Sequence, residues 1–294
     1  MNECPGMTVR EWDRLSAGTD YGGRTVADNG AVDLEMDRAH SARMYDYYLG
    51  GTTNFPADRE AAARARAAFP SVLATAAINR RFMHRSVRFL ARDGMSQFLD
   101  IGTGIPTSPN LHEVAQTEDP RARVVYTDND PIVLAHARAL LQSRPEGRTA
   151  YVHADATEPE ALLAAEELRG TLDFARPIAL SLNALLHFVT GDHRAHDIVE
   201  HLKDVLPSGS TLAIAHVTAE FDPEGITRLI DTYRAAGTLA QARTHDEIAR
   251  FFEGWELFPP GIVPSHEWRP DPGDGSESIT NEVASCYVGV ARKP

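Results

Sequence analysis

The chain has 294 residues, of which 43% are hydrophobic, and its 29 basic and 42 acidic residues give a formal net charge of −13. This balance argues against a surface built for duplex nucleic acid, which requires clustered Lys and Arg. No stretch reaches the ~18 to 20 apolar residues of a membrane span. Only Cys4 and Cys286 occur, too few for a disulfide framework. The first residues also lack a basic and then apolar leader, so we expect a cytoplasmic protein.

The N-terminal third is predicted to be an arm followed by helices. Residues 1–36 are rich in Gly, Asp, Thr and Asn without periodicity, which is typical of a mobile arm. In residues 37–94, apolar side chains recur at helical spacing and predict three helices, separated by the pair Gly50-Gly51 and by Pro70. We call residues 37–94 the helical preface.

From residue 95 to the end, short apolar strands alternate with helices. The strand candidates are residues 97–101, 123–127, 150–154, 177–183 and 211–217, followed by 255–261 and 284–292. Such alternation indicates a mostly parallel sheet with helices on both faces. The last two candidates have no long helix between them, which predicts an antiparallel element at one edge. The sequence therefore predicts one α/β domain behind the helical preface.

A glycine-containing loop follows the first predicted strand. The sequence "FLDIGTGIPT" runs from an apolar strand into Asp100 and then into Gly102 and Gly104. Glycines so close together allow a sharp turn or a close approach of the backbone to a ligand. In parallel α/β sheets, ligands bind at the carboxyl ends of the strands, where this loop is expected.

A dinucleotide is a weak candidate for this ligand. The fingerprint G-x-G-x-x-G would place its third glycine where Thr107 stands, and Pro106 removes an amide donor that a pyrophosphate needs. The P-loop pattern G-x-x-x-x-G-K-[ST] does not occur in the chain. An NAD-linked oxidoreductase is therefore disfavoured.

S-adenosylmethionine fits the acidic residues at the strand ends better. Its amino group needs a carboxylate such as Asp100, and its ribose diol needs a bidentate acceptor such as Asp128 after the second strand. After the third strand, Asp155 can accept from the adenine amino group, and Ala156 is small enough to lie against the ring. The alternative for Asp155 is a purely structural role, in which it caps the turn before Thr157. Three acids at three successive strand ends nevertheless form a more specific signal than one glycine loop.

The chain resembles the class I S-adenosylmethionine-dependent methyltransferases. More narrowly, it resembles an actinobacterial group labelled "S-adenosyl methyltransferase". The motifs that carry the resemblance are "SARMYDYYLGGTTNF" (41–55), "FLDIGTGIPT" (98–107), "VVYTDNDPIVLAHARALL" (124–141) and "ALLHFV" (184–189). The resemblance implies a Rossmann-like seven-stranded sheet with an antiparallel last strand over residues 95–294.

The same resemblance implies where the cofactor is held. The expected contacts come from Asp100 and the loop Gly102-Thr103-Gly104, from Asp128 with the adjacent Asn129, and from Asp155 with Ala156. The loop departs from the commonest form at two positions. Thr103 stands where Cys or Ser is frequent, and Pro106 interrupts the stretch.

The helical preface is expected to cover the cofactor and shape the acceptor pocket. We hypothesise that Arg80 or Arg81 binds the cofactor carboxylate, because a guanidinium matches that group bidentately. Tyr45 and Tyr48 are candidates for lining the sulfonium region, since an aromatic face attracts a cation. The alternative for both tyrosines is that they only pack the preface onto the sheet.

Methyl transfer chiefly requires positioning, with a base only where the acceptor must lose a proton. Near the end of the fourth strand, Asn183 could bind the cofactor or the acceptor, and His187 could act as a general base. His187 could equally be a hydrogen-bonded core residue. An N-P-P-[YF] tetrapeptide, typical of methyltransferases that act on amino groups of nucleic-acid bases, is absent from the chain.

The function expected from the sequence is methyl transfer to a small-molecule acceptor. The alternative is a protein that binds S-adenosylmethionine or S-adenosylhomocysteine as a regulator or accessory module. No metal is expected: His193 and His196 are three residues apart on a predicted helix, but H-E-x-x-H and a third ligand are missing. Neither a nucleic-acid nor a membrane partner is expected.

Overall fold

The structure is a computed structural model that describes residues 35–140 and 142–294. The arm predicted over residues 1–36 lies almost entirely outside the described residues. Within this part of the chain, none of the helices has the length and apolar character needed to span a membrane.

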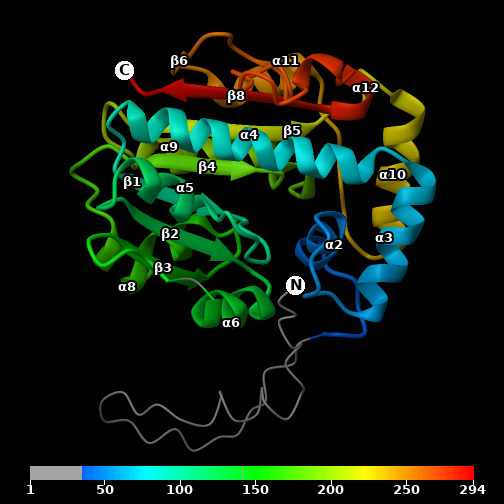
Figure 1. Cartoon of the computed structure of the whole chain (residues 1–294), viewed down its shortest axis with the longest axis horizontal. Helices are drawn as coiled ribbons and strands as arrows, with labels where there is room; N and C mark the ends of the chain where they lie inside the picture. The colour runs from blue at the N-terminus through cyan, green and yellow to red at the C-terminus, as the bar shows by residue number, and fades with distance from the viewer. Residues whose placement is uncertain (1–34, 141) are drawn as a thin grey trace, which may run out of the picture. The chain divides into compact units, whose positions relative to one another are not determined.

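A single sheet organises residues 97–292 (Figure 1). Its strand order is β3-β2-β1-β4-β5-β8-β6, and the two-residue strand β7 pairs with β8 beside this path. The strands are β1 (Gln97–Ile101), β2 (Arg123–Asp128), β3 (Arg148–His153), β4 (Ala179–Asn183), β5 (Thr211–Val217), β6 (Glu256–Leu257), β7 (Val263–Pro264) and β8 (Cys286–Arg292). The pairings among strands β1 to β5 are all parallel, whereas β8 is antiparallel to β5. The predicted Rossmann-like fold with an antiparallel last strand is confirmed, with β7 as an addition.

Strand β1 lies in the centre of the sheet because both of its faces are apolar. All five of its residues are buried, as expected for a parallel strand covered on both sides. Phe98 packs in a cluster with Phe82 and Leu90 of α4 (Val72–Arg92). Leu99 belongs to the cluster on the opposite face, which includes Leu202 of α9 (Asp192–Asp204). Successive side chains of β1 point to opposite faces of the sheet, so this one strand packs against helices on both faces.

Further helices complete these two layers. They are α5 (Leu111–Glu118), α6 (Pro131–Leu140), α7 (Pro159–Ala164), α8 (Glu166–Thr171), α11 (His245–Ala249) and α12 (Asn281–Ala284), with short 3-10 turns η1 (Leu186–Phe188), η2 (Arg250–Phe252) and η3 (Ser276–Ser278). Helix α5 begins after Asn110, whose side chain forms a capping box with Glu113.

The helical preface forms a third apolar cluster with a helix from the second half of the chain. Its helices are α2 (Ser41–Tyr48), α3 (Pro56–Ala68) and α4, and they pack with α10 (Pro223–Ala235). Met44, Ala65 and Val72 of the preface share this cluster with Ile226 and Leu229 of α10. Figure 1 shows α3 and α10 beside each other, although about 150 residues separate them along the chain. Two distant segments therefore build one wall beyond the carboxyl ends of the parallel strands.

Buried charges connect α2 to the start of α6. The Arg43 guanidinium is 2% exposed, and its Nε lies 3.2 Å from Oδ2 of Asp130 and 3.7 Å from Oδ1 of Asp58. Asp130 also accepts from the amide of Ile132 at 2.9 Å, so it begins α6 as well as pairing with Arg43. Asp58 accepts from the amide of His40 at 2.9 Å. Because these charges have little access to water, removal of one partner is expected to leave the others buried and uncompensated, which destabilises the fold.

Candidate functional site

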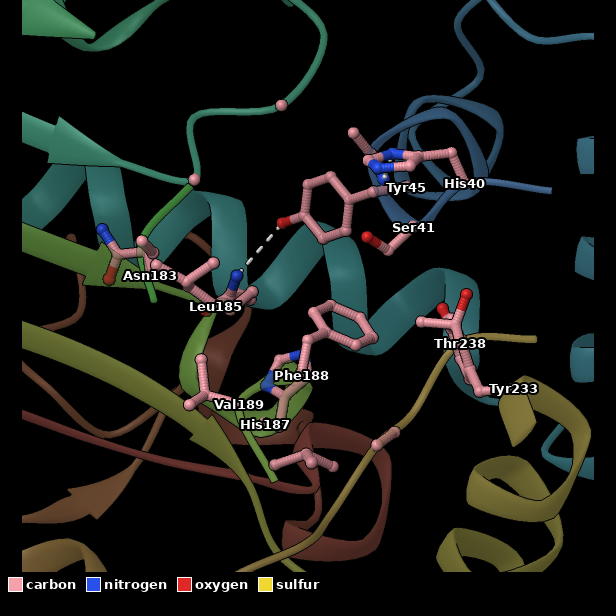
Figure 2. A pocket seen from close by; sticks show the side chains of 18 of the residues that line it. His40, Ser41, Tyr45, Asn183, Leu185, His187, Phe188, Val189, Tyr233 and Thr238 are labelled. Atoms are coloured by element: carbon pink, nitrogen blue, oxygen red, sulfur yellow. Dashed lines mark hydrogen bonds between the residues drawn. The ribbon is translucent and has the colours of Figure 1, made fainter. Parts of the chain in front are cut away.

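A cavity of about 670 Å³ lies between the carboxyl ends of β1, β2 and β4 and the wall formed by α2, α4 and α10. Figure 2 shows part of its lining, with Tyr45 and His40 on one side, Asn183 and His187 on another, and Tyr233 and Thr238 farther along. A volume of this size is typical of a small-molecule site. One end is polar and the other is apolar, and we describe them in turn.

The glycine loop after β1 has two left-handed residues. Gly102 has φ of +72° and Gly104 has φ of +69°, a region that other residues rarely adopt. A Cβ on Gly102 would lie 2.6 Å from Cδ1 of Leu185, whereas a Cβ on Gly104 would have no atom within 4 Å. Gly102 is therefore required by packing as well as by the backbone, while Gly104 borders open space in the cavity.

Asp100 occupies the end of β1 and is 8% exposed. Its carboxylate accepts hydrogen bonds from the hydroxyls of Thr103 and Ser181, each at 2.7 Å. Burial raises the pKa of Asp100 above its ordinary value, and these two hydrogen bonds partly oppose the shift. The raised pKa shows that the carboxylate lacks a counter-charge strong enough to offset its burial.

Asn183 extends this network at the end of β4. Its Nδ2 donates to the Ser181 hydroxyl at 2.9 Å, while its Oδ1 is buried and has no hydrogen-bond partner among the described residues. An unmatched acceptor beside a buried carboxylate suits a ligand that carries an amino group. The network thus offers the hydrogen-bond acceptors that the ammonium group of S-adenosylmethionine is expected to need.

Asp128, at the end of β2, holds the glycine loop from the other side. Its oxygens accept from the amide of Gly104 at 2.8 Å and from the amide of Asp130 at 3.0 Å. Burial raises its pKa, although both amide bonds favour the charged form. Each carboxylate oxygen has a further lone pair, so the group can still accept from a diol.

The turn after β3 completes the polar end. Asp155, Ala156 and Asn129 all line the cavity. Asp155 is exposed and accepts from the amide of Thr157 at 2.7 Å, which is the local capping role left open as an alternative. The structure therefore places Asp155 at the site and also gives it a structural bond.

The two candidate arginines point to different places. Arg80 lines the cavity and donates to the carbonyls of Thr107 and of Pro109, the latter at 2.9 Å, while its buried Nε has no partner among the described residues. Arg81 instead donates to the carbonyl of Asp274 at 3.0 Å and does not line the cavity. The structure brings Arg80, and not Arg81, to the site.

Tyr45 and Tyr48 both line the cavity and both pack in the preface cluster. The Tyr45 hydroxyl donates to the carbonyl of Ala76 and accepts from Nδ2 of Asn79, each at 3.1 Å (Figure 2, dashed line). The hydroxyls of Tyr48 and Tyr233 lie 3.1 Å apart, and burial raises the pKa of Tyr233 to about 12. Burial also raises the pKa of Tyr45 and of Tyr48, so all three phenols are neutral at physiological pH.

His187 lies in η1, between the sheet and the preface wall (Figure 2). Burial and the charge of Arg243 lower its pKa to about 3, so the imidazole is neutral at pH 7. Its Nδ1 is buried without a hydrogen-bond partner among the described residues. Its ring lies 4.4 Å from that of Phe188, centroid to centroid.

We call the end of the cavity that lies against the preface wall the distal chamber. It is lined by Tyr45, Tyr48, Val72, Phe188, Leu229 and Tyr233. From the sequence alone, the α10 segment could either cover the pocket or only complete the fold, because its ordinary amphipathic pattern gives no signal of a site. Sequence analysis missed Asn79, a buried polar residue on α4 that bonds Tyr45.

Among the described residues, no group of three or more His, Cys, Asp or Glu side chains could hold a metal ion. The side chain of His193 lies outside the described part of the structure. Its predicted neighbour, His196, is half-buried, and its Nε2 lies 3.9 Å from Oε1 of Glu200.

The strand order, the antiparallel last strand and the acids at the strand ends define a class I S-adenosylmethionine-dependent methyltransferase. A family model described as S-adenosyl methyltransferase matches residues 27–294, and the chain belongs to this family. S-adenosylmethionine is accordingly its cofactor.

Two solved structures are similar over nearly their whole length. One is a DUF574 family protein from Streptomyces avermitilis, with 50% identity and a TM-score of 0.86, over 89% of this chain and 100% of the other. The second is a protein from Thermobifida fusca, provisionally named a methyltransferase, with 39% identity and a TM-score of 0.81, over 88% of this chain and 97% of the other. No curated protein matches the chain.

Proposed function

We propose that the protein transfers the methyl group of S-adenosylmethionine to a small molecule held in the distal chamber, by in-line displacement. The observation that carries this proposal is one continuous cavity that joins the strand-end carboxylates to the distal chamber. A cofactor bound at the polar end would thus face an acceptor at the other. Enclosure of both in about 670 Å³ favours a small acceptor over a macromolecule.

The polar end holds the cofactor in this proposal. Asp128 accepts from the ribose diol, and Asp100 with Oδ1 of Asn183 receives the amino group. The backbone of Gly102-Thr103-Gly104 lies against the ligand. When bound, the cofactor supplies an electrophilic methyl group on a sulfonium, whose sulfur keeps the bonding electron pair as the methyl leaves.

The remaining contacts are assigned by position. Arg80 binds the cofactor carboxylate through its unpartnered Nε, and Asp155, Ala156 and Asn129 surround the adenine. This buried Nε is a donor without an acceptor, the arrangement expected where an anionic group of a ligand belongs. Arg81 has no part in this assignment because it faces Asp274.

His187 is proposed to accept the proton that the acceptor loses. A neutral imidazole with an unpartnered nitrogen can take up a proton. Its low pKa makes it a weak base, and this suffices for an acceptor that becomes strongly acidic as its new bond to carbon forms. Tyr45 and Tyr48 present their rings to the sulfonium region.

A titration with S-adenosylhomocysteine by calorimetry tests the cofactor site. We expect the parent protein to bind, and Asp128→Ala to bind about 100-fold more weakly, because the loss of two charge-assisted hydrogen bonds is worth about 3 kcal/mol. Asp271→Ala is the matched control. Asp271 is an exposed carboxylate that pairs with Arg88 at 2.8 Å and does not line the cavity. Equal binding by the parent and Asp128→Ala would refute the assignment of Asp128.

A further inference from the structure

The distal chamber differs from the polar end in its charge. Among the described residues that line the cavity, the Asp and Arg side chains are Arg80, Asp100, Asp128 and Asp155. All four lie at the strand ends or bond the loop after β1. The part of the chamber wall that the structure describes contributes no Asp, Glu, Lys or Arg.

Several of its hydroxyl groups are already engaged. Tyr45 both donates and accepts a hydrogen bond, the hydroxyls of Tyr48 and Tyr233 bond each other, and Thr75 donates to the carbonyl of Val283 at 2.6 Å. An anionic acceptor that entered this chamber would exchange its hydration for neutral and apolar groups. Such a transfer is unfavourable without a partner of opposite charge.

The shape-defining side chains are aromatic. Tyr45 comes from α2, Phe188 from η1 and Tyr233 from α10 (Figure 2). The ring centroids of Phe188 and Tyr233 lie 5.6 Å apart at 54°. Aromatic faces and edges at such spacing favour another planar ring through offset or edge-to-face contact.

His187 and Asn79 offer neutral hydrogen-bond acceptors to a substrate. Nδ1 of His187 and Oδ1 of Asn79 are both buried without a partner among the described residues, so a hydroxyl or amine on the substrate could donate to either of them after a small adjustment. Aliphatic side chains of Val72 and Leu229 also line the chamber. The chamber thus combines ring-binding surfaces with neutral hydrogen-bond acceptors, and the described part of its wall carries no fixed charge.

We propose that the distal chamber takes a neutral, ring-containing acceptor that carries a hydroxyl group, and that it discriminates against carboxylates and phosphates. This inference rests on the proposed function, since the chamber is the acceptor site only if the polar end holds S-adenosylmethionine. It goes further by naming the chemical class of the acceptor.

Two probes with the same ring system test the charge preference. They are 2-naphthol, which is neutral at pH 7, and 2-naphthoate, which is an anion. Each is titrated by calorimetry into the protein saturated with S-adenosylhomocysteine, so that the adenine region cannot bind the ring. We expect 2-naphthol to bind and 2-naphthoate to bind at least about tenfold more weakly, since its carboxylate finds no counter-charge.

A variant that fills the chamber locates the binding. Ile230 on α10 lines the cavity and is half-buried, so Ile230→Trp should be tolerated and should abolish 2-naphthol binding. Thr227→Trp is the matched control, because Thr227 is an exposed residue of the same helix that does not line the cavity. Both variants should keep the parent affinity for S-adenosylhomocysteine.

The outcomes separate the two proposals. If the parent protein does not bind S-adenosylhomocysteine, the proposed function is overturned. In that case, 2-naphthol binding that Ile230→Trp abolishes and Thr227→Trp preserves would still show that the distal chamber binds a neutral ring. If S-adenosylhomocysteine binds, the inference is overturned by any of three results. These are undetectable binding of 2-naphthol, 2-naphthoate that binds as tightly as 2-naphthol, or 2-naphthol binding that survives Ile230→Trp.

Discussion

Replacing Gly102 or Gly104 by Ala tests the reading of the glycine loop. Both have φ near +70°, and an L-residue in that region costs about 1 to 2 kcal/mol. At Gly104 nothing else opposes the new methyl group. At Gly102 it would lie 2.6 Å from Cδ1 and 3.1 Å from Cγ of Leu185, so the whole side chain must leave its rotamer, for about 0.5 to 1.5 kcal/mol more.

The measurable result is the order of two melting temperatures. At about 2 to 4 °C per kcal/mol for a protein of this size, Gly104→Ala should lower Tm by roughly 2 to 8 °C, and Gly102→Ala by a few degrees more. Gly50→Ala is the matched control, because Gly50 has φ of +78°, has open space at its Cβ and does not line the cavity. It should match Gly104→Ala. Differential scanning calorimetry without ligand suffices, and equal losses at Gly102 and Gly104, or the reverse order, would refute the packing argument.

Three further changes address buried ionisable groups. Arg43→Met leaves the carboxylates of Asp58 and Asp130 without their buried partner, so urea unfolding should show a loss of about 3 to 5 kcal/mol; a loss under 1 kcal/mol would contradict the pairing. Asp100→Asn should stabilise the ligand-free protein at pH 7 but not at pH 3. A carboxyl whose pKa is raised by burial is most stable when protonated and loses stability as pH rises through that pKa; a gain that is independent of pH would exclude this cause. The pKa of His187 falls from 6.5 to about 3 on folding, so the protein should lose about 2 kcal/mol of stability through this group as the pH falls from 6.5 to 5. His187→Gln should remove that part of the pH dependence. An unchanged dependence would show that His187 is not buried as described.

The strand ends were predictable from the sequence because a buried parallel strand is a short run of apolar residues, and the end of the run marks the end of the strand. Asp100 and Asp128 each stop such a run, and the fold then brings their side chains to one edge of the sheet. The capping box at Thr244 and Glu247 was likewise readable from local spacing, since both of its bonds form within one turn.

Contacts between distant segments were not predictable in this way. Arg80 and Arg81 are adjacent on one helix, and only the positions of Thr107 and Asp274 decide which of them reaches the cavity. The sequence Asp130-Pro131 is typical of a helix start, but the second role of Asp130 depends on Arg43, which lies 87 residues earlier in the chain. A single sequence does not indicate which distant residues form such pairs, because the pairs arise from tertiary packing rather than from local propensity.

The position of β8 affects how the protein is made. This strand pairs with β5 on one side and β6 on the other, contributes Val288 and Val290 to a core cluster and places Cys286 at the cavity. It also follows every other element that lines the cavity. During synthesis, therefore, the nascent sheet carries β5 as an open edge until residues 286–292 leave the ribosome, and such an edge is a template for pairing with other chains. A ribosome that stops before Cys286 would release an aggregation-prone chain without a finished cavity, although every acidic residue proposed to bind the cofactor had already been synthesised.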